Sequence, residues 1–221
     1  MDHHRRQEVW RIDADAPLQA VLDAPECPSL LRQTLTGVLS WQARNETPVR
    51  RALSAPRVAP QWVAALLALG ATVTVDGDDG PSEVALEALL RGQAGGRASA
   101  LHVPVGPGGA SLAEAHVGRT PTDEPIVAAV AAVEVAGDAV RQARVALTGV
   151  WPEAVRLAEA PAQLVGGPLD AERVGAVAEA VEQEVAPKGD WLGSAEYRRA
   201  MAAVMTRRAL VSCLRREVGD E

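Results

Sequence analysis

Aromatic side chains are scarce in this chain of 221 residues, which contains no phenylalanine, one tyrosine and five tryptophans. Hydrophobic residues nevertheless make up 48% of the sequence, and most of them are Ala, Val and Leu. The core must therefore be built from small aliphatic side chains that pack closely. The length suits one large domain or two small ones.

Reactive and metal-ligating residues are equally sparse. The two cysteines, Cys27 and Cys213, lie far apart and match no metal or redox spacing. His102 and His116 lie in strand-like segments without the spacing of metal ligands. No Ser, His and Asp set stands in a recognisable catalytic motif. The sequence thus predicts no catalytic residue and no metal site.

The sequence also lacks an excess of positive charge and a long apolar run. Its formal net charge of -7 repels phosphate backbones, so we expect no nucleic-acid partner. The longest apolar stretch, residues 126–133, is too short to cross a bilayer. Residues 1–8 are charged and resemble no signal peptide. We therefore expect a cytoplasmic protein without a membrane span.

The first half of the chain predicts a mixture of short helices and strands. Residues 42–59 are polar, contain two prolines, and are interpreted as a connection. Residues 62–69 form an apolar helix that Gly70 ends. We expect further helical segments within residues 17–39 and strands over residues 9–12, 71–76 and 101–105.

The second half predicts an antiparallel sheet covered by helices. Residues 126–150 indicate a hairpin with its turn at Gly137-Asp138, and residues 152–165 a short helix. Two further helices begin after the candidate caps Asp170 and Ser194. We expect both to pack on one face of the sheet, with Tyr197 buried on the apolar side of its helix. The predicted fold class is therefore α+β.

Residues 193–199 (Gly-Ser-Ala-Glu-Tyr-Arg-Arg) and 207–210 (Arg-Arg-Ala-Leu) resemble a known family. They are similar to the C-terminal end of the flavoprotein (medium) subunits of molybdenum hydroxylases, the carbon monoxide dehydrogenase and xanthine dehydrogenase group. Residues 143–150, with Pro152, Arg156 and Glu159, resemble the strand and turn that open that family's C-terminal domain.

The resemblance implies a division of the chain. Residues 1–16 form an N-terminal tail with a short strand, and residues 17–124 a truncated region similar to the second FAD-binding subdomain. Residues 125–221 form a domain similar to the flavoprotein C-terminal domain of CO dehydrogenase, an antiparallel sheet with packed helices. The family's first flavin subdomain, which carries another glycine-rich phosphate loop, has no counterpart in this sequence.

FAD is the cofactor that the resemblance implies, and its segment is altered here. Residues 42–45 (Gln-Ala-Arg-Asn) and 64–69 fit the family without a gap between them, which makes Arg44, Asn45, Arg50 and Arg51 the cofactor-binding residues. The family has two glycines where this chain has Arg50 and Arg51, and a threonine where it has Pro48. Glycines let backbone N–H groups approach phosphates, whereas arginine side chains fill that space and proline has no N–H. We therefore expect flavin binding to be weakened or lost.

By resemblance, the chain is a divergent medium subunit of a molybdenum hydroxylase-like oxidoreductase complex. Such subunits hold FAD and pass electrons between iron–sulfur clusters and an external acceptor, beside iron–sulfur and molybdopterin subunits. The chain alone is not expected to be catalytic. The alternative is a flavin-less scaffold or assembly partner of such a complex, and a third interpretation is an unrelated small α+β binding protein.

Overall fold

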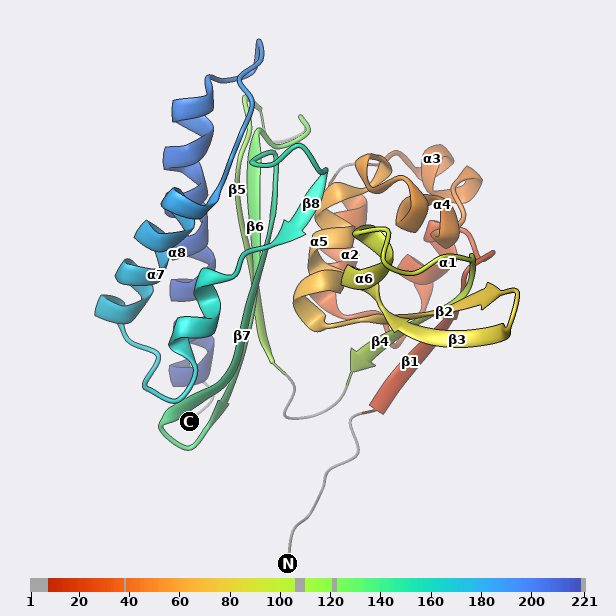
Figure 1. Ribbon diagram of the computed structural model, residues 1–221, viewed down its shortest axis with the longest axis horizontal. Coiled ribbons are helices and arrows are strands. Elements are labelled where there is room, and N and C mark those ends of the chain that lie inside the picture. The colour runs from red at the N-terminus through yellow and green to blue at the C-terminus, as the bar shows by residue number, and fades with distance from the viewer. Residues whose placement is uncertain (1–7, 38, 106–109, 121–122, 220–221) are drawn as a thin grey trace, which may run out of the picture.

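Two lobes, each built on one antiparallel sheet, lie side by side (Figure 1). The structure is a computed structural model that describes residues 8–37, 39–105, 110–120 and 123–219, with side chains as far as residue 215. The N-terminal sheet has four strands in the order β1-β4-β2-β3, and the C-terminal sheet has four in the order β5-β6-β7-β8.

The N-terminal lobe wraps short helices around one long apolar helix. Its elements are β1 (Glu8–Asp13), α1 (Leu18–Asp23), α2 (Ser29–Thr36), α3 (Trp41–Glu46), α4 (Val49–Ser54), η1 (Pro56–Val58), α5 (Pro60–Leu69), β2 (Thr72–Gly77), β3 (Gly80–Ala85), α6 (Leu86–Leu90) and β4 (Arg97–Val105). Helix α5 is buried on all sides, from Pro60 to Ala68, and ends at Gly70 in the left-handed region, as its sequence predicts.

The interpretation of residues 42–59 as a polar connection is wrong, because this segment contains α3, α4 and η1. Helix α4 buries Val49, Ala52 and Leu53, which lie three and four residues apart and therefore on one face. Each of these helices has six residues or fewer. So short a piece shows too little periodicity to be recognised among arginines and prolines.

The C-terminal lobe is the expected hairpin sheet with two packed helices. Its elements are β5 (Ser111–Val117), β6 (Val127–Ala136), β7 (Ala139–Thr148), β8 (Val155–Leu157), η2 (Ala160–Leu164), α7 (Ala171–Glu184) and α8 (Ala195–Gly219). The β6–β7 turn lies at Gly137, whose φ is +61°. Strand β5 precedes residue 125 yet pairs with β6, so this sheet begins at Ser111.

The expectation of one helix over residues 152–165 is wrong. Val155 pairs with Thr148 and Leu157 with Ala146, which makes this stretch the fourth strand of the sheet. The short helix η2 follows it. Three residues of strand are too few for alternation to distinguish them from a helical turn in the sequence.

Both faces of the C-terminal sheet are buried, which explains the unbroken apolar sequence of β6. Alternate residues of β6 point in opposite directions. Val127, Ala129 and Ala131 pack in the cluster that contains α7 and α8 residues. Val130 and Ala132 pack in the cluster that contains α5. The helices α7 and α8 thus cover one face and the N-terminal lobe covers the other (Figure 1).

Both predicted helix caps are confirmed, but the predicted burial of Tyr197 is wrong. Asp170 accepts a hydrogen bond from the backbone N–H of Arg173, and Ser194 from that of Tyr197. Tyr197 is 38% exposed, whereas Arg198 is 5% exposed. The buried stripe of α8 continues from Arg198 through Ala202, Met205 and Ala209. This stripe leaves Tyr197 about 100° away around the helix.

We predict that Gly149→Ala is strongly destabilising. Gly149 has φ of +75°, and an added Cβ would overlap the carbonyl oxygen of Ile126. Left-handed strain and overpacking together should lower the free energy of unfolding by at least about 3 kcal/mol. Gly137→Ala is the matched control, because Gly137 also has positive φ but no described atom lies within 4 Å of its Cβ position. It should cost about 1–2 kcal/mol. Equal losses for the two variants in urea unfolding would contradict the steric argument.

Candidate functional site

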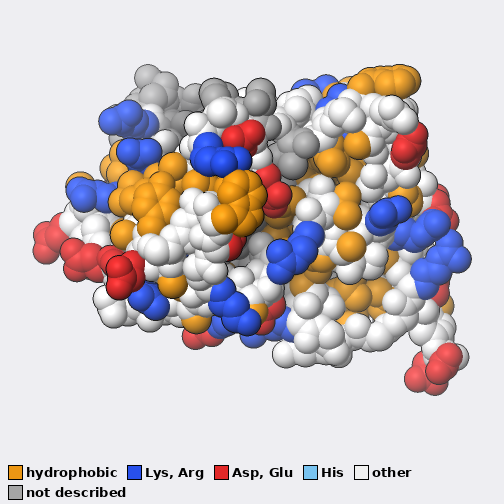
Figure 2. Space-filling model, turned by 90° about the horizontal axis from the view of Figure 1, so that it is seen from above, with side chains coloured by type: hydrophobic (Ala, Val, Ile, Leu, Met, Phe, Trp, Pro, Cys, Tyr) orange, Lys and Arg blue, Asp and Glu red, His pale blue; other side chains and the backbone are white. Residues whose placement is uncertain are grey.

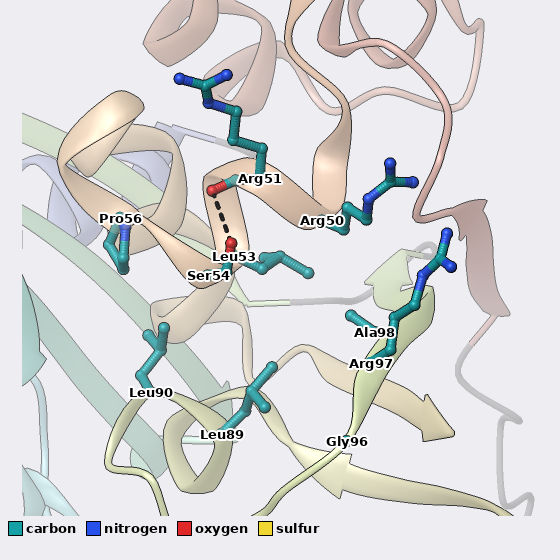
Figure 3. Close-up of a pocket in the computed structure, with 10 residues that line it drawn as sticks. All are labelled: Arg50, Arg51, Leu53, Ser54, Pro56, Leu89, Leu90, Gly96, Arg97 and Ala98. Carbon is teal, nitrogen blue, oxygen red and sulfur yellow. Dashed lines mark hydrogen bonds between the residues drawn. The ribbon is translucent and has the colours of Figure 1, made fainter. Parts of the chain in front are cut away.

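A pocket of about 510 Å³ lies where the resemblance places the flavin segment (Figure 3). Arg50 and Arg51 contribute to its lining from α4, and Arg97 from the start of β4. The remaining lining residues are Leu53, Ser54, Pro56, Leu89, Leu90, Gly96 and Ala98. The pocket therefore combines a cationic rim with an apolar wall.

One carboxylate compensates two of the three arginines. Asp15 forms an ion pair with Arg50, and its Oδ2 lies 3.2 Å from Nη2 of Arg97. Figure 3 shows Arg50 and Arg97 reaching toward the same side, while Arg51 points away from both. Within the described part of the chain, Arg51 forms no ion pair. An anion entering the pocket would thus meet two arginines that already share one carboxylate, while the guanidinium of Arg51 points away from the apolar wall (Figure 3).

Backbone donors around the two arginines are already occupied. The N–H of Val49 donates to the carbonyl of Ala16 (2.9 Å) and that of Arg50 to the carbonyl of Ala14 (2.8 Å). The N–H of Arg51 donates to the carbonyl of Pro48 (2.9 Å), and Pro48 has no N–H. Backbone N–H groups that bind a pyrophosphate must be free to point at it. Residues 48–51 do not fit that requirement.

The other two predicted site residues lie away from this pocket, on α3. Arg44 donates from Nε to Oε1 of Gln19 (2.8 Å) and from Nη1 to the carbonyl of Leu39. Asn45 donates from Nδ2 to the carbonyl of Trp41 (2.8 Å). Neither lines the pocket. Arg44 thus connects α3 to Gln19 of α1 and to Leu39, and Asn45 forms a hydrogen bond within α3.

Arg97, which completes the cationic rim, and Asp15, which pairs with Arg50 and Arg97, are not predicted from the sequence. Arg97 and Asp15 are 82 positions apart, and no motif connects them. Arg97 follows Gly95-Gly96 at the start of β4, and this glycine pair is the one local signal of a special backbone there.

A second arginine centre is built around Arg198. Its Nη1 donates to the carbonyls of Ile126 (2.7 Å) and Gly149 (2.9 Å). Its Nη2 donates to both carboxylate oxygens of Asp190, at 2.8 and 2.7 Å. Arg198 therefore connects the segment before β6, the end of β7 and the turn before α8.

Asp190 is held in its ionised form by these contacts. The hydrogen bond from Arg198 lowers the pKa of Asp190, burial acts in the opposite direction, and the backbone N–H groups of Leu192 and Gly193 lower it further. The N–H groups lie 2.9 and 3.2 Å from Oδ1 of Asp190. The turn from Asp190 to Gly193 is thereby fixed at several points.

This fixed turn displays an exposed tryptophan. Trp191 is 77% exposed, and the guanidinium of Arg119 lies 4.6 Å from its ring centroid. Figure 2 shows apolar side chains gathered beside cationic ones on the C-terminal lobe, at the left of the view. Trp, Tyr and Arg are the residues most often found at the energetic centre of protein interfaces.

Few reactive groups stand outside these centres. Burial raises the pKa of the Cys27 thiol, and the charge of Arg32 opposes that shift. Burial also lowers the pKa of Arg144, against the charges of Glu87 and Glu134. The described residues include no group of three His, Cys, Asp or Glu side chains that could hold a metal ion. Among them, no helix combines the length and apolar character needed to cross a membrane.

The C-terminal lobe matches a known protein family. Residues 115–213 match the CO dehydrogenase flavoprotein C-terminal domain. The carbon monoxide dehydrogenase medium chain of Afipia carboxidovorans is 32% identical over 148 residues, which are 64% of this chain and 51% of that protein. The chain thus spans about half the length of this curated relative.

Solved structures extend the similarity to both lobes. Reconstituted CO dehydrogenase from Oligotropha carboxidovorans has a chain with a TM-score of 0.76 and 26% identity, covering 92% of this chain and 74% of that one. A carbon monoxide dehydrogenase from Hydrogenophaga pseudoflava, 24% identical, shares the fold with a TM-score of 0.80 over 94% of this chain and 76% of that one. The predicted resemblance to medium subunits and the predicted α+β fold are confirmed.

We predict that Asp190→Asn changes how stability depends on pH. Because the folded-state pKa of Asp190 is lowered, its carboxylate stabilises the fold above its unfolded pKa of about 4, and this contribution is lost as pH falls through the folded pKa. Wild type should therefore lose stability steeply below about pH 4. Asp190→Asn should be less stable at neutral pH and show a shallower acid slope in chemical unfolding.

The background Arg198→Met provides the control for this prediction. In that background the principal cause of the pKa shift is gone, so Asp190→Asn should alter the acid slope much less. The same change of slope in both backgrounds would show that Arg198 is not responsible.

Proposed function

We propose that this chain is a divergent medium (flavoprotein-type) subunit of a molybdenum hydroxylase-like oxidoreductase complex in which flavin binding is weakened or lost. The family match of residues 115–213 and the 32% identity to a carbon monoxide dehydrogenase medium chain support the subunit role. The proposed partners are the iron–sulfur and molybdopterin subunits of such a complex, and the proposed location is the cytoplasm. The N-terminal lobe, which ends before β5, is proposed to be a truncated FAD-binding-subdomain-like region that precedes the C-terminal-like domain.

The observation that carries the flavin part of this proposal is the occupied backbone of residues 48–51. A pyrophosphate needs free donors that approach it closely. Here the N–H groups of Val49 and Arg50 bond to the segment just before α1 instead. Asp15 adds a negative charge beside the place where phosphates would lie. Arg51 is the lining arginine without an ion pair to a described residue, and its guanidinium would have to turn toward the pocket to hold a phosphate bidentately.

The alternative role, a flavin-less scaffold or assembly partner of the complex, is favoured by the turn that displays Trp191. A large apolar side chain held outward on a rigid turn loses little conformational entropy when a partner covers it. Tyr197 and Arg119 lie with it at the same end of the lobe. This surface does not depend on a bound flavin, so it would serve either role.

In calorimetric titration we expect the full chain to bind added FAD with a Kd above about 1 µM, which corresponds to a binding free energy weaker than about -8 kcal/mol. Residual binding should fall at least about tenfold in Arg51→Ala, the scale of one lost charge-assisted contact. Arg50→Ala should have a smaller effect, because Asp15 already compensates that charge.

Asp15→Asn should strengthen the residual binding of FAD, because it removes a carboxylate that repels phosphate. Arg11→Ala is the control for the arginine variants, because Arg11 is an exposed arginine on β1 that does not line the pocket. Stoichiometric binding by wild type at micromolar affinity or better would contradict weakened flavin binding. Equal binding by wild type and the Arg51 and Arg50 variants would show that this pocket holds no phosphate.

A further inference from the structure

A groove runs between the edge strand β5 and helix α8, on a different part of the molecule from the arginine pocket. Strand β5 is the first of the order β5-β6-β7-β8, and its outer edge pairs with no strand in the part of the chain described. Helix α8 runs alongside β5 and β6 (Figure 1). Ser111 and Cys213 hold the two elements together, with the Ser111 hydroxyl donating to the Cys213 carbonyl at 3.3 Å. The groove has a volume of about 520 Å³.

The wall of this groove on α8 is strongly basic. Arg207, Arg208 and Arg215 line it, together with Val211 and Ser212. All three arginines are exposed, and none forms an ion pair with a described residue. In a chain with a net charge of -7, three uncompensated cations along one groove are a local reversal of the surface charge. Such a groove attracts acidic groups.

The wall on β5 lies at the outer edge of the sheet, where residues 114–116 pair with β6 on one side and with no described strand on the other. Glu114, Ala115 and His116 line it. Glu114 is the one carboxylate among the lining residues, and it accepts a hydrogen bond from Gln61, which lies outside the groove. Its Oε1 also lies 3.4 Å from Nδ1 of His116. Proteins often protect an edge strand with charges on the strand itself. Here the positive charges lie on α8, at Arg207, Arg208 and Arg215, and line the same groove as the edge of β5.

The spacing of the arginines matches an extended chain. Arg207 and Arg215 are eight residues apart on α8, which is about 12 Å along a helix axis. About four residues of a strand cover the same distance, and alternate side chains of a strand point to one face. Acidic residues at every second position could therefore reach the arginines while their backbone pairs with β5.

We propose that this groove binds an extended acidic segment of a partner protein, which adds as a strand to the edge of β5 and places alternate carboxylates against Arg207, Arg208 and Arg215. Backbone pairing supplies affinity, and the arginines select acidic sequences. A second copy of this chain is disfavoured as the occupant, because pairing β5 with β5 across a two-fold axis would bring the two sets of arginines together. The inference does not depend on flavin binding.

The experiment measures fluorescence anisotropy of a labelled, end-capped peptide, Val-Glu-Val-Glu-Val-Glu-Val, with the full chain at low salt. Wild type should bind saturably and lose affinity with salt. Arg207→Ala with Arg208→Ala should weaken binding at least tenfold, whereas Arg11→Ala with Arg141→Ala, two exposed arginines outside the groove, should leave it unchanged. Replacing the central glutamate by proline should also weaken binding at least tenfold, because a proline cannot donate to a strand.

Three outcomes would overturn the proposal. Equal binding of the parent and proline peptides would mean attraction of acidic peptides without strand pairing. Equal binding by wild type and the groove variant would place the site elsewhere. Absence of saturable binding would mean that the arginines only protect the edge of β5 from pairing or form a contact between copies of this chain. Sedimentation of wild type and of the groove variant distinguishes these two cases by their oligomeric state.

Discussion

The C-terminal lobe depends on one buried charge. Arg198 joins two backbone carbonyls and a carboxylate that lie far apart in the chain, since Ile126 is 72 positions away and Gly149 is 49. Burial of a guanidinium is costly unless it is paired and hydrogen-bonded, and here both Nη atoms of Arg198 have partners, so each partner constrains the others. Gly149 must have no Cβ near the Ile126 carbonyl, and Asp190 must stay ionised. The residues around Arg198 that carry the family resemblance therefore stabilise the fold of the C-terminal lobe.

The N-terminal lobe depends on the apolar packing of α4, which is independent of the contacts of Arg198 in the C-terminal lobe. Helix α4 is held by Val49, Ala52 and Leu53, which face the core, while the side chains of Arg50 and Arg51 point away from that core. Arg50 and Arg51 therefore stand on α4 without disturbing its packing. Burial of apolar area on the inner face maintains this helix whatever side chains stand on its outer face.

The sequence predicted those elements that are marked by hydrophobic spacing and by capping or turn residues close to them in the chain. The hairpin, the caps at Asp170 and Ser194, and the apolar helix ended by Gly70 all followed from spacing and punctuation. Helices α3 and α4 and strand β8 were missed because they are too short to show a period. Tyr197 was expected to be buried because hydrophobic periodicity cannot anticipate a buried arginine. Of the predicted site residues, only Arg50 and Arg51 line the pocket, and the ion pairs of Asp15 depend on tertiary contacts that no motif encodes.

We propose that this chain has the fold of a flavoprotein subunit but lacks a phosphate-binding loop for FAD. The visible absorption spectrum of the purified full chain tests it most directly, recorded as isolated and again after incubation with excess FAD and removal of free flavin by gel filtration. The account predicts that no flavin bands remain with the protein in either sample. One flavin retained per chain after gel filtration would contradict it.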